Sequence, residues 1–182
     1  MLRIAVFCGA NTGTDQGILQ AAQAIGRTIA SRGMGVVYGG GHVGLMGAVA
    51  DATLQAGGEV IGVIPGFMVE KELAHRGLTE LIVVRDMHER KMRMHELSQA
   101  VIALPGGFGT LDELFELLTW RQLGLHNKPI GLLNVNGFYT ALLEQAGRMA
   151  QDGFLHGPTR IIASANVDEL LDRMTVAPEV RS

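Results

Sequence analysis

The chain has 182 residues, of which 47% are hydrophobic and 18% are charged. This length suits one globular domain with a sizeable core, and the composition excludes a disordered segment. The net charge of −3 gives no basic footprint for nucleic acid. No apolar run reaches the ~18 residues that a membrane span requires.

The cysteine content indicates a reducing compartment. Cys8 is the only cysteine, which excludes an internal disulfide and a cysteine-based metal quartet. Because Cys8 lies in an apolar run, we expect a small buried core residue and not a nucleophile. The first residues also lack the pattern of a signal peptide, so we expect a cytoplasmic protein.

Short apolar runs alternate with segments of helical periodicity along the chain. The predicted strands comprise residues 3–9, 35–38, 59–64, 80–84, 100–104, 129–134 and, as a seventh, 161–164. The predicted helices comprise residues 16–31, 45–56, 87–99, 138–151 and 167–174, and one more follows the glycines at 106–109. Residues 67–77 predict a loop or short helix, and residues 177–182 a frayed tail.

Strands that alternate with helices form right-handed βαβ units and a parallel sheet. We therefore predict an α/β fold, a Rossmann-like doubly wound parallel sheet of six or seven strands, with residues 1–182 as a single nucleotide-binding domain. Ligands of such sheets bind outside the carboxyl ends of the strands, at the switch point. Two glycine-rich loops, at residues 39–44 and 106–109, follow predicted strands and therefore mark the expected site.

The second of these loops is the strongest local signal. Residues 104–113 have the sequence LPGGFGTLDE between a buried strand and a helix. Glycine lets the backbone adopt positive φ and lets a ligand approach closely. The first amides of the helix have no intrahelical partner and lie at the positive end of its dipole, which favours a bound phosphate.

Glu113 in this stretch has two interpretations. Thr110 and Glu113 match the T-x-x-E capping box, with Thr110 as the N-cap. Alternatively, Glu113 faces the sugar beyond the phosphate and stabilises a cationic transition state. The local sequence leaves both interpretations open, and both can hold in different states of the protein.

The first loop matches G-x-G-x-x-G at Gly39, Gly41 and Gly44. The dinucleotide fingerprint, however, requires an acidic residue at the end of the next strand, where this chain has the sequence IPG at residues 64–66. We therefore interpret the loop as the wall of a nucleotide pocket and not as an NAD(P) site. Glycines that serve only close helix–strand packing are the alternative.

The helix before the fifth strand begins with a possible cap, Asp86 and Glu89. Arg90 and Lys91 then place positive charge near a helix N-terminus, where the dipole disfavours it. A solvated basic face that Arg93 continues is one account. The other is that Arg90 directs its fork of donors at the purine or phosphate of a ligand. The six histidines lack metal-ligand spacing, so we expect no metal.

Several blocks together resemble one family. Residues 105–113 match P-G-G-x-G-T-x-x-E, the signature of the Lonely guy (LOG) family, cytokinin riboside 5′-monophosphate phosphoribohydrolases that are often labelled lysine decarboxylases. Residues 38–47, 72–81 and 87–91 match further blocks. The resemblance extends from the first strand to about residue 154. One departure is Ala10, where relatives usually carry serine, which weakens that turn as a ligand contact.

The resemblance implies hydrolysis of the N-glycosidic bond of a purine nucleoside 5′-monophosphate, of cytokinin or adenine type, to free base and ribose 5-phosphate, without a cofactor. It implies Arg90 and Glu113 as catalytic residues. The substrate-binding residues expected from the resemblance and from the first glycine loop are Glu72, Arg90, Lys91, Gly107, Phe108, Gly109, Thr110, Leu111, Asp112, Glu113, Thr119, Gly40, Gly41 and Gly44. It also implies a homodimer with the site near the subunit interface.

The residue types fit this chemistry. Departure of a purine leaves an oxocarbenium-like ribosyl cation, which we expect Glu113 to stabilise while it orients the attacking water. Arg90 would draw electron density from the leaving base through hydrogen bonds. The amides of Gly107, Gly109 and Thr110 would anchor the 5′-phosphate and supply binding energy remote from the reacting bond.

Other functions compete with this one. A pyridoxal phosphate decarboxylase needs a Schiff-base lysine, and Lys71, Lys91 and Lys128, the three lysines of the chain, lie outside any convincing cofactor loop. A nucleotide or molybdenum-cofactor carrier of similar fold is the serious rival, but mere binding has no evident need for Glu113 beside Arg90. The sequence does not distinguish adenine from an N6-prenylated adenine.

Overall fold

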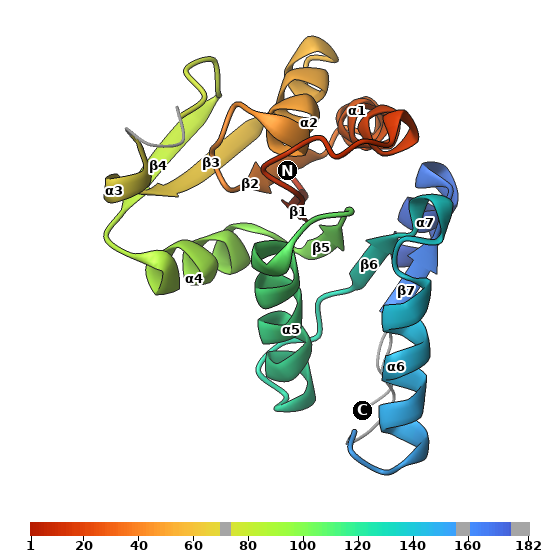
Figure 1. Cartoon of the computed structure of the whole chain (residues 1–182). Helices are drawn as coiled ribbons and strands as arrows, with labels where there is room; N and C mark the ends of the chain where they lie inside the picture. The colour runs from red at the N-terminus through yellow and green to blue at the C-terminus, as the bar shows by residue number, and fades with distance from the viewer. Residues whose placement is uncertain (70–73, 156–160, 176–182) are drawn as a thin grey trace.

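A computed structural model of the chain describes residues 1–69, 74–155 and 161–175. These residues form a parallel sheet of seven strands in the order β4-β3-β2-β1-β5-β6-β7 (Figure 1). The strands are β1 (Arg3–Phe7), β2 (Gly35–Tyr38), β3 (Val60–Pro65), β4 (Glu80–Val84), β5 (Ala100–Ala103), β6 (Ile130–Leu133) and β7 (Ile161–Ser164). The predicted doubly wound α/β fold is therefore confirmed, with the seventh strand included.

Strand β1 is the centre of the sheet. Ile4 is in register with Val36 of β2 on one side and with Ala100 of β5 on the other. The chain builds β1 to β4 outward in one direction, then returns across the sheet and builds β5 to β7 in the other. The switch point therefore lies between β1 and β5, and the loops that follow these two strands diverge there.

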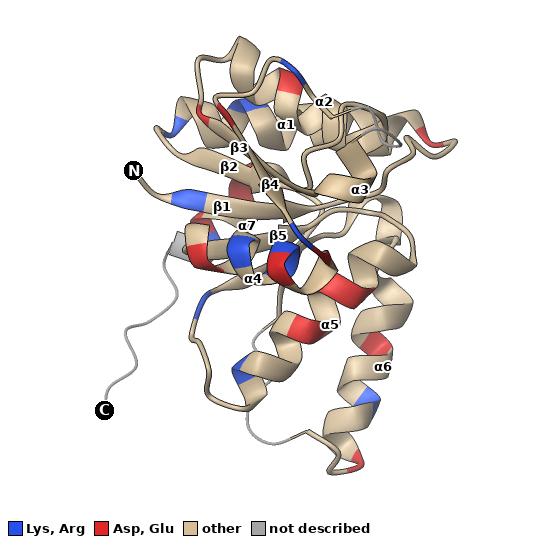
Figure 2. Ribbon diagram, turned by 90° about the vertical axis from the view of Figure 1, so that its left-hand side faces the viewer, with Lys and Arg blue, Asp and Glu red and all other residues tan. Residues whose placement is uncertain are grey.

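Helices cover both faces of the sheet (Figures 1 and 2). They are α1 (Gln16–Ser31), α2 (Gly44–Gln55), α3 (Gly66–Val69), α4 (Met87–Leu97), α5 (Phe108–Gln122), α6 (Thr140–Gln151) and α7 (Val167–Thr175), with a 3₁₀ turn at Val135–Gly137. Alternate residues of β1 point to opposite faces. Ile4 and Val6 pack with α1, α2 and α7, whereas Ala5 and Phe7 pack with α4 and α5.

Most predicted boundaries agree with the structure to within two residues, and the exceptions have local causes. The predicted helix at residues 138–151 begins two residues later, at Thr140, after a 3₁₀ turn at Val135–Gly137 in which Asn136 and Gly137 adopt positive φ. The helix after the glycine loop starts at Phe108, two residues before the predicted cap. The short helix expected within residues 67–77 is α3, while residues 70–73 and the tail at 177–182 lie outside the described residues.

Acidic and basic residues are interspersed over the surface (Figure 2). Within the described residues, no helix is both long enough and apolar enough to cross a membrane. The same residues contain no group of three or more His, Cys, Asp or Glu side chains that could hold a metal ion.

Candidate active site

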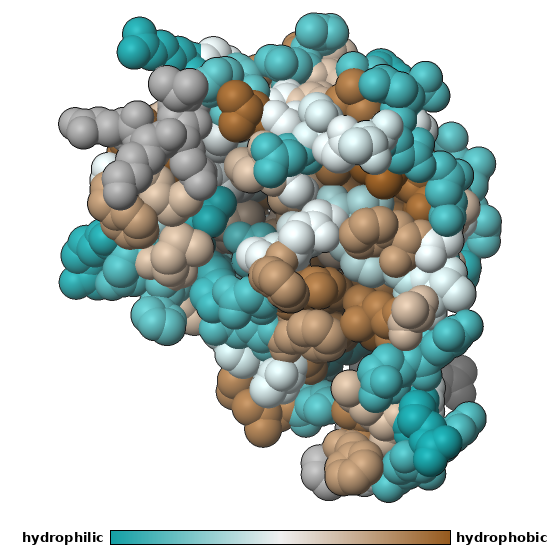
Figure 3. Space-filling view, viewed as in Figure 1, coloured by the Kyte–Doolittle hydropathy of each residue, from teal (hydrophilic) through white to brown (hydrophobic). Residues whose placement is uncertain are grey.

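A cavity of about 560 Å³ opens at the carboxyl ends of β1, β2 and β5, at the switch point where the sequence predicts a ligand. Figure 3 shows this face of the molecule hollowed near its centre. The lining residues are Val6, Cys8, Gly9, Ala10, Asn11, Thr12, Gly13, Ile18, Gly39, Leu45, Met46, Met68, Met87, Arg90, Pro105, Gly106, Gly107, Gly109, Thr110, Glu113 and Phe138. Both predicted catalytic residues, Arg90 and Glu113, are among them.

The turn between β5 and α5 forms one wall of the cavity. Gly107 is the N-cap of α5, and no side chain caps this helix. The amides of the first turn therefore have no side-chain acceptor, which suits an anion. A Cβ atom on Gly107 or Gly109 would have no neighbour within 4 Å, so at both positions the backbone lies open to an approaching ligand.

The capping box is wrong. Gly107 adopts the extended conformation of an N-cap, so Thr110 is the third residue of α5 and not its cap. Glycine is tolerated at the N-cap, and it lets the helix begin earlier than the T-x-x-E pattern suggests. Thr110 is buried, and its Oγ1 lies where a Cβ atom of Gly106 would be, 2.1 Å from the ideal position. Gly106 thus makes room for Thr110.

Arg90 is buried, with an exposed fraction of 7%, so the solvated basic face is wrong for this residue. Its Nε donates to the carbonyl of Val63 at 3.2 Å and its Nη2 donates to the carbonyl of Gly39 at 3.1 Å. Two backbone carbonyls at the ends of β2 and β3 therefore fix the guanidinium. Arg93, by contrast, is exposed and pairs with Glu96 at the surface.

The start of α4 positions Arg90. The carboxylate of Asp86 accepts a hydrogen bond from the amide of Glu89 at 2.9 Å, so the predicted N-cap is confirmed. The Glu89 carboxylate accepts from the amide of Arg85 and not from that of Asp86. This cap fixes the first turn of α4 and so directs the next residue, Arg90, toward the sheet.

Glu113 lies on α5 opposite Arg90. Its Oε1 is 3.7 Å from Nη1 of Arg90, which is within ion-pair range but too long for a hydrogen bond. Burial raises the pKa of Glu113 to about 7; Arg90 and Lys91 oppose this rise, whereas Asp112 and Glu116 add to it. A buried carboxyl that titrates near neutrality beside a fixed cation is suited to acid–base or electrostatic catalysis.

The turn after β1 is a part of the site that the sequence interpretation undervalued. Residues 9–13 line the cavity, and the amide of Gly9 donates to the carbonyl of Pro105 at 3.2 Å. The carbonyl of Gly9 in turn accepts from the amide of Leu45 at 3.1 Å. The backbone of Gly9 therefore links the turn after β1 by hydrogen bonds to the loop after β5 and to the start of α2. The signal that finds this turn is topological, because β1 borders the switch point.

Cys8 is buried, as predicted, and burial raises the pKa of its thiol.

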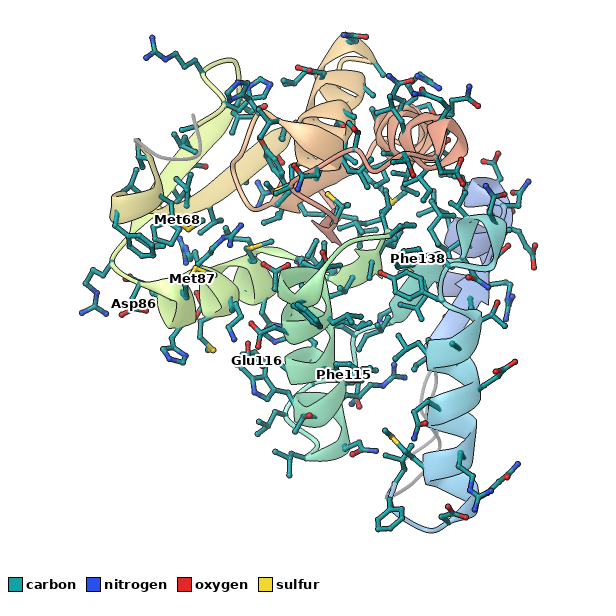
Figure 4. The ribbon with its side chains drawn as sticks, in the orientation of Figure 1. Met68, Asp86, Met87, Phe115, Glu116 and Phe138 are labelled. Carbon is teal, nitrogen blue, oxygen red and sulfur yellow. The ribbon has the colours of Figure 1, made fainter. Side chains whose placement is uncertain are left out.

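Apolar side chains from separate elements complete the lining. Met68 of α3 and Met87 of α4 lie on one side of the cavity, and Phe138 lies on the other (Figure 4). Met87 begins the block at residues 87–91, whereas Met68 and Phe138 belong to no recognisable motif. They are far apart in the chain, so no local sequence signal predicts that they meet.

Several predicted substrate-binding residues lie outside the cavity lining of the described chain. Phe108 is 92% exposed, Leu111 packs on the core, and Thr119 is exposed. Lys91 and Asp112 pair with each other. In the first loop it is Gly39 that lines the cavity, next to the predicted Gly40, Gly41 and Gly44. Glu72 lies outside the described residues.

Comparisons with known proteins give the family. A family model described as "Possible lysine decarboxylase" matches residues 46–174. The cytokinin riboside 5′-monophosphate phosphoribohydrolase of Rhodococcoides fascians is 53% identical over 158 residues, which cover 86% of this chain and 80% of that protein. The chain belongs to this family, the LOG family. A member from Arabidopsis thaliana is 43% identical over 174 residues, covering 94% of this chain and 76% of that protein.

Solved structures show the same fold at lower identity. The molybdenum cofactor binding protein from Rippkaea orientalis superposes with a TM-score of 0.72 and 22% identity, covering 96% of both chains. The molybdenum cofactor carrier protein from Chlamydomonas reinhardtii gives 0.70 and 21%, covering 96% of both chains. At this identity the likeness concerns the fold alone.

The decarboxylase name of the family model does not fit the lysines of this LOG-family site. Pyridoxal phosphate would need an amine aimed into the cavity. Lys91 lies between the carboxylates of Asp112 and Glu116, and Nζ of Lys128 donates to the backbone carbonyl of His95. Of the lysines in the described ranges, neither lines the cavity.

Proposed function

We propose that the protein hydrolyses the N-glycosidic bond of a purine nucleoside 5′-monophosphate and releases free base and ribose 5-phosphate. The observation that carries this proposal is Glu113, a largely buried carboxyl with its pKa raised to about 7, whose Oε1 lies 3.7 Å from Nη1 of Arg90 at the wall of the cavity. The start of α5, which no side chain caps, lines the same cavity. Relatives that are 43–53% identical carry this activity in their names.

The 5′-phosphate binds at the first turn of α5 in this proposal. The amides of Gly107, Gly109 and Thr110 are the expected donors, because the helix N-terminus attracts negative charge. A phosphate held there supplies binding energy away from the reacting bond, which can be used to distort and orient the sugar. Ribose then extends from the phosphate toward Glu113, which follows Thr110 by about one turn on the same helix.

Glu113 acts at the sugar. The bond between C1′ and the purine nitrogen breaks, its electron pair leaves with the base, and C1′ becomes cationic. The Glu113 carboxylate stabilises this charge and orients a water molecule for attack at C1′. It accepts one proton of that water and afterwards releases it to solvent, and the departing base takes up a proton from solvent. Water is thus consumed, and ribose 5-phosphate and base are formed.

Arg90 acts on the leaving base. Two backbone carbonyls accept from its Nε and Nη2. Its Nη1 donates to Sδ of Met87 at 3.9 Å and lies 3.7 Å from Oε1 of Glu113. A hydrogen bond from this nitrogen to the purine withdraws electron density and makes the base a better leaving group. Met68 and Met87 border the same region and provide an apolar surface for the purine.

We further propose that the protein works in the cytoplasm as a homodimer with the site near the interface. The buried thiol of Cys8 suits a reducing compartment. Large apolar side chains are exposed on α5 and around α6, among them Phe115, Phe138 and Phe154 (Figures 3 and 4). Such a surface suits burial against a second copy. The substrate-binding roles of Glu72, Phe108 and Thr119 stay predictions, which a structure of the dimer with bound nucleotide would test.

Product analysis tests the function. AMP and N6-isopentenyladenosine monophosphate are incubated with wild type and with Glu113→Gln, and the base is quantified by chromatography. We expect free base from wild type and at least about 10²-fold less from the variant. Equal base release from both proteins contradicts the role of Glu113. Tight nucleotide binding by wild type without release of base instead favours the carrier.

A further inference from the structure

A second group of ion pairs joins helices α4 and α5 beside the Arg90–Glu113 pair. Nζ of Lys91 lies 3.2 Å from Oδ2 of Asp112 and 3.0 Å from Oε2 of Glu116. Glu116 lies on the side of α5 that faces α4 (Figure 4). Arg90 and Lys91 are consecutive on α4, and the three carboxylates occupy little more than one turn of α5. Two cations therefore face three anions across this contact.

Lys91 is built into this contact and not into the cavity. Its side chain is 12% exposed, and it is not among the residues that line the cavity in the described chain. Burial lowers the pKa of Lys91, but hydrogen bonds to Glu116 and Asp112 outweigh burial and raise it overall. The ammonium group thus stays charged between its two acceptors.

We propose that Lys91 is a positioning residue for the reaction: its ammonium group holds Asp112 and Glu116 and thereby controls the charge state of Glu113. The inference rests on the proposed function, in which Glu113 reacts as a carboxylate. It gives Lys91 a role different from that of a substrate contact.

The electrostatic reason follows from the neighbours of Glu113. Arg90 and Lys91 on α4 lower the pKa of Glu113, and Asp112 and Glu116 on its own helix raise it. Among the described residues, Cys8, which follows β1, also interacts electrostatically with Glu113, and burial keeps its thiol neutral. Without Lys91, two unneutralised carboxylates and one cation would surround Glu113. The anionic form of Glu113 would then be disfavoured further.

Titration of Glu113 tests the inference without relying on turnover. Protein labelled with ¹³C at the glutamate carboxyl is followed by NMR against pH, and Glu113→Gln assigns the resonance. We expect Lys91→Gln to raise the midpoint by about half to one pH unit. Lys91→Gln combined with Glu116→Gln should return it toward wild type, and Lys91→Arg should leave it unchanged. Arg93→Gln, on the same helix but away from Glu113, is the matched control.

Kinetics add a second readout. The acid limb of the kcat–pH profile should move with the NMR midpoint in Lys91→Gln, while KM stays within about twofold. An unchanged midpoint overturns the inference, and so does a large rise in KM with an unmoved limb, which indicates direct substrate contact. Should wild type release no base while the midpoint still shifts, the proposed function fails and the control of Glu113 by Lys91 stands.

Discussion

The carbonyl oxygen of Gly39 accepts a hydrogen bond from Nη2 of Arg90 at 3.1 Å, and a Cβ atom on Gly39 would lie 1.9 Å from that same nitrogen. The residue therefore holds the guanidinium with its backbone and admits it by having no side chain. Gly39, which follows β2, therefore positions the side chain of Arg90 on α4, whether or not it also contacts a ligand.

Gly39→Ala should displace Arg90 and remove activity while the fold persists. Gly39 does not have positive φ, so alanine is compatible with the backbone, and the strain falls on the guanidinium. A displacement of about 1 Å can lower kcat by about 10²-fold. The measurement is kcat with AMP, together with the melting temperature.

Gly147→Ala is the matched control for this variant. Gly147 lies inside α6, where a Cβ atom meets nothing within 4 Å. Alanine there should leave kcat unchanged and stabilise the helix by up to about 1 kcal/mol. Wild-type activity in Gly39→Ala would show that Arg90 does not need its observed position.

Activity should rise with pH through about 7. The carboxylate of Glu113 is the active form in our proposal, and burial raises the pKa of this residue to about 7. Below that value kcat should fall about tenfold per pH unit, because the ionised fraction falls at that rate. A kcat that is level from pH 5 to pH 8 would contradict ionisation of Glu113 as the controlling step.

Glu113→Gln should stabilise the protein at alkaline pH. The pKa of Glu113 is raised on folding from 4.5 to about 7, so the folded chain binds the proton more tightly and loses stability as pH rises between these values. By about pH 8 the loss is nearly complete and is on the order of 3 kcal/mol. Denaturant unfolding at pH 8 should show this gain for the variant, and unfolding near pH 4 should show almost none.

Gly107→Ala should weaken phosphate binding without harming the fold. Its added methyl group meets no protein atom within 4 Å and so occupies the space beside the first amides of α5. We expect affinity for ribose 5-phosphate, measured by calorimetry, to fall about tenfold or more. Adenosine, which lacks the phosphate, is the control ligand, and equal losses for both ligands would place the phosphate elsewhere.

The fold was predictable because short apolar runs, several of them next to glycine or proline, alternate along the chain with segments of helical length. What failed was the detail of helix starts. Thr110 matched a capping pattern, but a tertiary demand decided otherwise: Thr110 packs under Gly106, and the helix begins with Gly107 as its cap. Such packing between residues cannot be predicted from a local sequence pattern.

The site was predictable where a motif carries it. Arg90 and Glu113 lie within blocks of recognisable sequence, and both line the cavity. Met68 and Phe138 come from isolated positions that only the folded chain brings together, and the burial of Arg90 depends on carbonyls of β2 and β3 that no helical periodicity reveals. The chemistry of the individual residues could be predicted from the sequence, but the contacts between residues far apart in the chain could not.

Helix α4 carries the chain from the edge strand β4 back beneath β3, β2 and β1 to β5. Arg90 lies on this return, whereas Glu113 and the anion site lie after it. During synthesis from the N-terminus, the nascent chain thus acquires the arginine before it acquires the carboxylate. A chain that ends before Glu113 therefore carries only one of the two proposed catalytic side chains and lacks the first turn of α5.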